Sequence, residues 1–127
     1  MYISSRIRFG VVHSLDGYDE ISLTDDFKIA LPEREKIYSP EMLNMERCHA
    51  SDLYGGETPE DAAVIFRAVM ERSASKHQMN CVIANAAFAI QVMFREKKID
   101  KCIEEATDSL MNGKAMTALK KFLEANK

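Results

Sequence analysis

The stretch that decides the fold covers residues 75–94 and reads SKHQMNCVIANAAFAIQVMF. Ser75 followed by Gln78 is typical of a capping box, which begins a helix. The helix predicted over residues 76–94 is apolar on nearly its whole circumference, and Asn85 interrupts its longest apolar run. Because such a helix must be covered on most sides, we expect it at the centre of the fold.

Further helices are predicted before and after this one. Ser39-Pro40 begins a short helix that ends near Met45, and Thr58-Pro59 begins a longer one. Asp100 is predicted to cap another helix, which Asn112-Gly113 interrupts. The last helix is predicted over residues 114–125, with four inward-facing apolar residues: Met116, Leu119, Phe122 and Leu123.

Strands are predicted only in the first third of the chain. Residues 7–15 form an apolar run of strand length, and residues 20–24 and 27–31 alternate between apolar and polar side chains. Residues 36–39 return as an antiparallel partner, which predicts a hairpin. Strands followed by helices favour an α+β fold. We expect one partial domain over residues 1–127, strand-rich to residue 39 and helical from residue 40.

Composition narrows the class of protein. The 127 residues are 46% hydrophobic and carry a net charge of −3, without a basic block, so nucleic-acid binding gains little support. No apolar run reaches the length of a membrane span, and residues 1–6 lack the apolar centre of a signal peptide. The cysteines, Cys48, Cys81 and Cys102, are odd in number and widely spaced, which predicts neither disulfides nor a zinc site. We expect a cytoplasmic protein.

Three carboxylates, Asp16, Asp19 and Glu20, lie close together around Gly17. One interpretation is a Mg²⁺ site, because this ion is held by one or two carboxylates together with substrate phosphates. The other is a solvated Asp-Gly turn. On a regular strand Asp19 and Glu20 would point to opposite faces, so they can share one ion only where the backbone is irregular.

Two other features allow a functional and a structural interpretation. Gly55-Gly56 precedes a helix N-terminus, where backbone N–H groups can bind phosphate, but the fuller glycine patterns of phosphate loops are absent, which favours a loop and helix cap. His13 ends a strand beside the acidic residues, where it either contacts a substrate or is simply a strand-end side chain. The histidines lack the spacing of a zinc site.

The acidic segment and its surroundings resemble anthranilate phosphoribosyltransferase. Residues 11–24, VVHSLDGYDEISLT, are similar to that family's "VVHG-DG-DEIS-T" segment. Residues 52–57, DLYGGE, are similar to its "DL-GGD" loop, residues 85–87 to its "NAA" helix, and residues 109–115 to the joint that contains "SGKA". These segments follow the family order over nearly the whole chain.

The resemblance implies transfer of phosphoribosyl from phosphoribosyl pyrophosphate to anthranilate in tryptophan biosynthesis, with Asp19 and Glu20 holding Mg²⁺ on the pyrophosphate. Two departures stand out: Ser14 replaces a usual glycine, and Asp25-Asp26 replaces a glycine-proline pair. The family's GTGGD and KHGNR motifs, and the arginine that meets anthranilate, have no counterpart here. The chain resembles only the C-terminal portion of the enzyme, and we expect it to be inactive alone.

A partial domain would leave the strand at residues 7–15 as an open sheet edge, and we expect self-association there. An alternative function is a non-enzymatic binding or assembly module that keeps part of the fold. A third possibility, a related nucleoside phosphorylase, is disfavoured by the Asp16–Glu20 segment.

Overall fold

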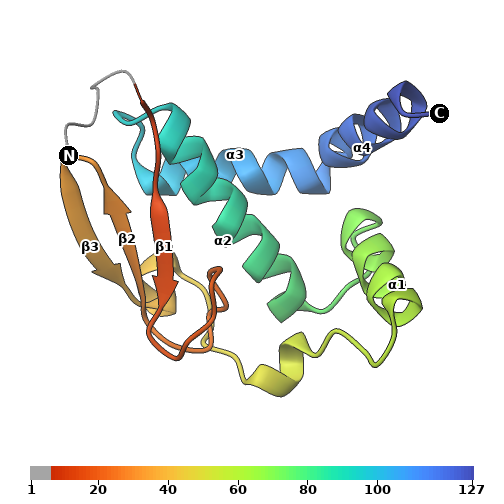
Figure 1. Cartoon of the computed structure of the whole chain (residues 1–127), viewed down its shortest axis with the longest axis horizontal. Coiled ribbons are helices and arrows are strands. Elements are labelled where there is room, and N and C mark those ends of the chain that lie inside the picture. Colours follow the sequence, from red (N-terminus) through yellow and green to blue (C-terminus); the bar gives the residue numbers. More distant parts are fainter. Residues whose placement is uncertain (1–6) are drawn as a thin grey trace.

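The computed structural model describes residues 7–127 and contains one antiparallel sheet of three strands, in the order β1-β2-β3 (Figure 1). β2 (Phe27–Leu31) forms where it was predicted and pairs with β3 (Arg34–Tyr38), which confirms the hairpin. β1 (Val11–Ser14) covers only part of the strand predicted over residues 7–15. Among the described residues it lies at the edge of the sheet and pairs with β2 alone.

All other regular elements of the described part are helical, so the α+β expectation is confirmed. They run along the chain as η1 (Pro40–Leu43), η2 (Ala50–Leu53), α1 (Pro59–Met70), α2 (Lys76–Met93), α3 (Ile99–Met111) and α4 (Lys114–Ala125).

The helix α2 covers the sheet and forms the centre of the core, as its sequence predicts (Figure 1). Ser75 accepts a hydrogen bond from the Gln78 N–H, and the Gln78 side chain accepts one from the Ser75 N–H, so the capping box is confirmed. Phe88 of α2 meets Phe27 and Tyr38 of the sheet edge-on, with ring centroids 5.6 and 4.9 Å apart. Each such aromatic pair contributes about 0.5–1.5 kcal/mol beyond its buried area.

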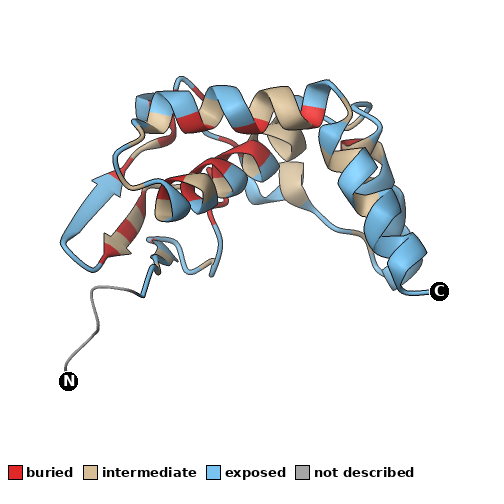
Figure 2. Ribbon diagram, turned by 90° about the horizontal axis from the view of Figure 1, so that it is seen from above, coloured by how far each residue is buried: buried red, intermediate tan, exposed pale blue. Residues whose placement is uncertain are grey.

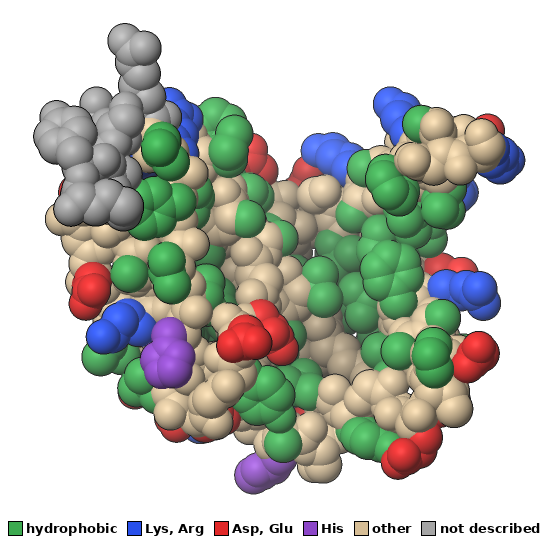
Figure 3. Space-filling model, viewed as in Figure 1, with side chains coloured by type: hydrophobic (Ala, Val, Ile, Leu, Met, Phe, Trp, Pro, Cys, Tyr) green, Lys and Arg blue, Asp and Glu red, His purple; other side chains and the backbone are tan. Residues whose placement is uncertain are grey.

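The helix α4 lies outside this core, whereas α1 contributes one buried residue to it, Val69. Thr58 caps α1 as predicted, by accepting a hydrogen bond from the Asp61 N–H. None of the residues in α4 is buried (Figure 2). Two of the four residues expected to face inward are half-buried, whereas Phe122 is 63% exposed, so the expected inward packing is met only in part. Apolar side chains of α1 and α4 instead line an open hollow of ≈ 510 Å³. Figure 3 shows apolar side chains gathered in the recess between these helices and α2.

The start of α3 differs from the prediction. Its N-cap is Lys98, which makes no side-chain capping bond, and Asp100 lies in the first turn instead. A carboxylate in the first turn still favours the helix, because it faces the positive end of the helix dipole. Gly113 separates α3 from α4 in a left-handed conformation with φ 79°, as the predicted interruption requires.

Two expectations concern targeting and membranes. Residues 1–6, which lack the apolar centre of a signal peptide, lie outside the described residues. Between residues 7 and 127, none of the helices has both the length and the apolar character that crossing a bilayer requires.

Candidate metal centre

The acidic residues lie in the irregular segment that joins β1 to β2. This segment starts with a tight turn in which the Gly17 N–H donates to the Ser14 carbonyl, 3.0 Å away, and Gly17 adopts φ 102°. Such a backbone favours glycine, so the Asp-Gly turn signal is confirmed. Asp16, Asp19 and Glu20 are all exposed.

Residues 20–24 are not the half-buried strand that their alternation predicts. Ile21, Ser22 and Leu23 are buried one after another, whereas a strand would turn Ser22 towards solvent. Leu23 also has φ 63°, in the left-handed region. The irregular backbone meets the condition under which Asp19 and Glu20 can share one ion.

Contacts from three other parts of the chain hold this backbone in place. The Ser14 hydroxyl donates to the Glu20 carbonyl at 2.7 Å. Asn85 of α2 binds Ile21 twice, accepting from its N–H at 3.0 Å and donating to its carbonyl at 2.8 Å. The Cys48 N–H donates to the Leu23 carbonyl at 3.0 Å. The serine that replaces the family glycine therefore has a structural role, because it fixes the carbonyl of Glu20.

Two thiols bind the backbone carbonyl of Ser22, which belongs to the same irregular segment. Cys81 and Cys48 both donate to the carbonyl oxygen of Ser22, with S···O distances of 2.8 and 3.4 Å. Burial raises the pKa of Cys81 to about 12, and burial also raises the pKa of Cys48. Both thiols therefore stay protonated near neutral pH and remain donors.

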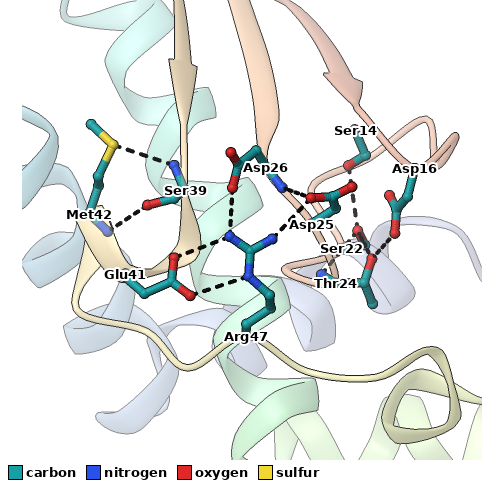
Figure 4. A network of polar contacts seen from close by, with 10 residues as sticks. All are labelled: Ser14, Asp16, Ser22, Thr24, Asp25, Asp26, Ser39, Glu41, Met42 and Arg47. Atoms are coloured by element: carbon teal, nitrogen blue, oxygen red, sulfur yellow. Dashed lines mark hydrogen bonds and ion pairs between the residues drawn. The ribbon is translucent and has the colours of Figure 1, made fainter.

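Asp16 differs from the other two acidic residues because it has a partner. Its carboxylate accepts a hydrogen bond from the Thr24 hydroxyl, which lies 2.7 Å from the Ser22 hydroxyl (Figure 4). Within residues 7–127, no hydrogen bond or ion pair involves the carboxylate of Asp19 or Glu20. This contrast separates one carboxylate that has a structural partner from two carboxylates that have none within residues 7–127.

The charges of Asp25 and Asp26 are balanced locally. Arg47 donates to Asp25 at 3.0 Å, to Asp26 at 2.6 Å and to Glu41 at 3.3 Å, so one guanidinium meets three carboxylates (Figure 4). Hydrogen bonds to Asp26 and Glu41 raise the pKa of Arg47 above its ordinary value. The departure from the family's glycine-proline pair is thereby compensated, although exposed ion pairs of this kind stabilise the fold only weakly.

The geometry can be compared with what Mg²⁺ needs. In the described part of the chain, no three His, Cys, Asp or Glu residues are grouped so that they could hold a metal ion. Proteins commonly bind Mg²⁺ through only one or two carboxylates, because the ion keeps several waters and also binds substrate phosphates. Asp19 and Glu20 match that requirement in number and kind of ligand. Glu20 also borders an open hollow of ≈ 430 Å³ between this segment, α1 and α2.

The glycines before α1 follow the structural interpretation. The Asp61 carboxylate accepts hydrogen bonds from the N–H groups of Glu57 at 3.0 Å and Thr58 at 3.2 Å. These are the donors that a phosphate at this helix end would need. Gly56 has φ 90°, and a Cβ there would lie 2.2 Å from the Asp61 Cβ, so glycine serves the close approach of the cap.

The residues that hold the acidic segment were not identified from the sequence as parts of the site. Asn85 and Cys81 are separated by four positions, so they lie on the same face of α2. The signal available in the sequence was an amide within an apolar helix, because an amide that is even partly removed from water needs hydrogen-bond partners.

Comparison with known proteins agrees with the resemblance. Residues 5–116 match the family model described as "Glycosyl transferase family, a/b domain". The chain is 61% identical over 125 residues to the anthranilate phosphoribosyltransferase of Bacteroides fragilis (strain YCH46), which covers 98% of this chain and 38% of the relative. It is 55% identical over 125 residues to the anthranilate phosphoribosyltransferase of Bacteroides thetaiotaomicron, again over 98% of this chain and 38% of the relative.

A solved structure shows the same fold. The anthranilate phosphoribosyltransferase from Saccharomyces cerevisiae in complex with PRPP and Mg matches with a TM-score of 0.79 at 18% identity, over 91% of this chain and 33% of that one. The chain thus spans 38% of the length of the curated Bacteroides relatives it matches.

Proposed function

Because the chain belongs to the glycosyl transferase family with this a/b domain, we propose that it is the C-terminal, Mg²⁺-binding portion of an anthranilate phosphoribosyltransferase. The identity of 61% over 98% of the chain supports this assignment. The observation that carries it is the exposed pair Asp19 and Glu20, which lacks partners within residues 7–127 and sits on a backbone held from several sides.

The proposed role of this portion is electrostatic. Mg²⁺, when bound, would offset the negative charge that develops on the departing pyrophosphate. Asp19 and Glu20 would hold that ion. Ser14, Asn85 and Cys81 fix the backbone of residues 20–22 in advance, so little reorganisation is needed during the reaction.

The rest of the reaction needs residues that the chain does not contain. The family's glycine-rich loop and anthranilate-binding arginine have no counterpart in these 127 residues. We therefore propose a single partial domain over residues 1–127, with the metal-binding acids in its strand-rich part (1–39) and a helical part over 40–127. The portion should show no turnover with both substrates and Mg²⁺, and family-like rates would contradict this.

The proposed location is the cytoplasm, since the three cysteines of the chain are free thiols, as is usual in a reducing compartment. The alternative of a non-enzymatic binding or assembly module is not favoured, because the curated relatives compared above are all named as the enzyme.

Binding of phosphoribosyl pyrophosphate, measured by titration calorimetry with Mg²⁺ or with EDTA, tests the proposal. We expect Mg²⁺-dependent binding that weakens by more than about tenfold in Asp19→Asn and Glu20→Gln, since loss of an outer-shell partner alone costs 10–100-fold. Asp100→Asn is the matched control, because it removes an exposed carboxylate from α3. Equal affinities in all four proteins would overturn the metal assignment.

A further inference from the structure

The polar contacts of α2 with the acidic segment are concentrated at two positions. Asn85 binds both backbone groups of Ile21, and Cys81, one turn earlier, donates to the carbonyl of Ser22. Ile21 and Ser22 directly follow Glu20. The helix α2 therefore holds the two residues that follow the proposed metal ligands.

The amide of Asn85 has only one orientation that satisfies these contacts. Its oxygen accepts from the Ile21 N–H, while its nitrogen donates to the carbonyls of Ile21 and Cys81, both at 2.8 Å. A flipped amide would set a donor against the N–H and an acceptor against two carbonyls. The bond to Cys81, which lies in the preceding turn of the same helix, anchors the amide to α2.

This arrangement replaces the strand partner that residues 20–24 lack. A neighbouring strand would bind one residue through both its N–H and its carbonyl, and the side chain of Asn85 does the same for Ile21. The segment can thus stay irregular, with Asp19 and Glu20 exposed, without leaving the backbone of Ile21 unpaired.

We propose that Asn85, assisted by Cys81, is a positioning residue that fixes the backbone carrying Asp19 and Glu20 for metal binding. This inference rests on the proposed function for its metal-binding part. The hydrogen bonds to Ile21 predict a further property, a protected amide, which does not depend on metal.

The first test uses the unaltered chain. We expect hydrogen exchange, followed by NMR, to show the Ile21 amide protected like amides of α2, although it lies outside every helix and strand. Rapid exchange of the Ile21 amide would overturn the inference whatever the metal does.

The second test uses Mn²⁺ as a paramagnetic probe for the Mg²⁺ site. In the unaltered chain we expect broadening of the Asp19 and Glu20 amide signals, which excess Mg²⁺ reverses. Asn85→Asp preserves the size of the side chain but places acceptors against two carbonyls. We expect it to weaken Mn²⁺ binding about tenfold, the lower end of the loss seen when outer-shell partners of ligands are removed.

Asn80→Ala is the matched control, since it removes a partly buried amide of α2 that makes no hydrogen bond within residues 7–127. It should leave both readouts unchanged. Undiminished Mn²⁺ binding in folded Asn85→Asp would contradict the positioning role. If that variant unfolds, Cys81→Ala replaces it, because it removes the hydrogen bond to the Ser22 carbonyl from the adjacent turn. Unchanged Mn²⁺ binding in Cys81→Ala would also contradict the positioning role.

The outcomes separate the two proposals. Absence of localised broadening in the unaltered chain would defeat the proposed metal site. Broadening that disappears in Asp19→Asn but persists in Asn85→Asp would defeat only the positioning role.

Discussion

Replacement of Phe88 by alanine should remove much of the stability of the fold. Phe88 is only 3% exposed and contacts both Phe27 and Tyr38 through its ring. Phe→Ala substitutions in cores cost about 3–5 kcal/mol. Phe88 also borders an open hollow of ≈ 390 Å³ between β1, β2 and α2. Because solvent and neighbouring side chains can fill the space left there, we expect about 3 kcal/mol, the lower end of that range.

Urea unfolding followed by circular dichroism measures this loss. With a slope of about 1.5 kcal/mol/M, typical of small proteins, a loss of about 3 kcal/mol lowers the midpoint by about 2 M. Phe122→Ala is the control, since Phe122 is mostly exposed and surface substitutions change stability by less than about 0.5 kcal/mol. If Phe88→Ala shifts the midpoint no further than Phe122→Ala does, α2 is not packed on the sheet as described.

Three further predictions concern the helix cap and the sheet edge. Gly56→Ala should destabilise the chain by at least about 1 kcal/mol in thermal melts, since φ is positive there and the new Cβ would collide with Asp61. Gly55→Ala is the control and should be nearly neutral, because a Cβ there has no atom within 4 Å. Hydrogen bonds from Glu57 and Thr58 lower the pKa of Asp61, so its contribution is present above the unfolded pKa and disappears as pH falls through the lower folded value. The melting temperatures of wild type and Asp61→Asn should therefore differ at pH 6 and converge as the pH falls through the lowered pKa. A difference that stays constant with pH would argue against the cap. Finally, Val11 is 56% exposed on the edge strand β1. We expect light scattering to show association that grows with concentration, and Val11→Lys should reduce it. A wild-type chain that stays monomeric at all concentrations would refute this association.

Local signals predicted α1 to α4 and the hairpin well, but not the short helix η2, which lies in a segment expected to be a loop. The capping boxes at Ser75 and Thr58 involve groups three residues apart, so the sequence carries both partners together. The alternation in β2 likewise marks its buried face, with Phe27, Ile29 and Leu31 directed to the core.

Residues 20–24 show where local reasoning fails. Ile21 and Leu23 alternate with polar neighbours as in a strand, yet the partner of Ile21 is an amide 64 positions away. The sequence is enough to propose the acidic pair as a site, but Ser14 and Asn85, which hold its backbone, depend on contacts that form only in the folded chain.

The apolar face of α4 gives a second example. Its periodicity correctly predicts an amphipathic helix over residues 114–125, but periodicity cannot specify what covers the apolar face. Among the described residues this face remains largely exposed, with Phe122 and Leu123 both more than half accessible.

Crystals of the chain grown with Mn²⁺ in place of Mg²⁺ give the most direct view of what the two neighbouring acids do. The account predicts an anomalous peak bound to carboxylate oxygens of Asp19 and Glu20, at roughly the 2.0–2.1 Å usual for Mg²⁺ ligands or slightly longer. A peak elsewhere, with both carboxylates directed into solvent, would contradict it.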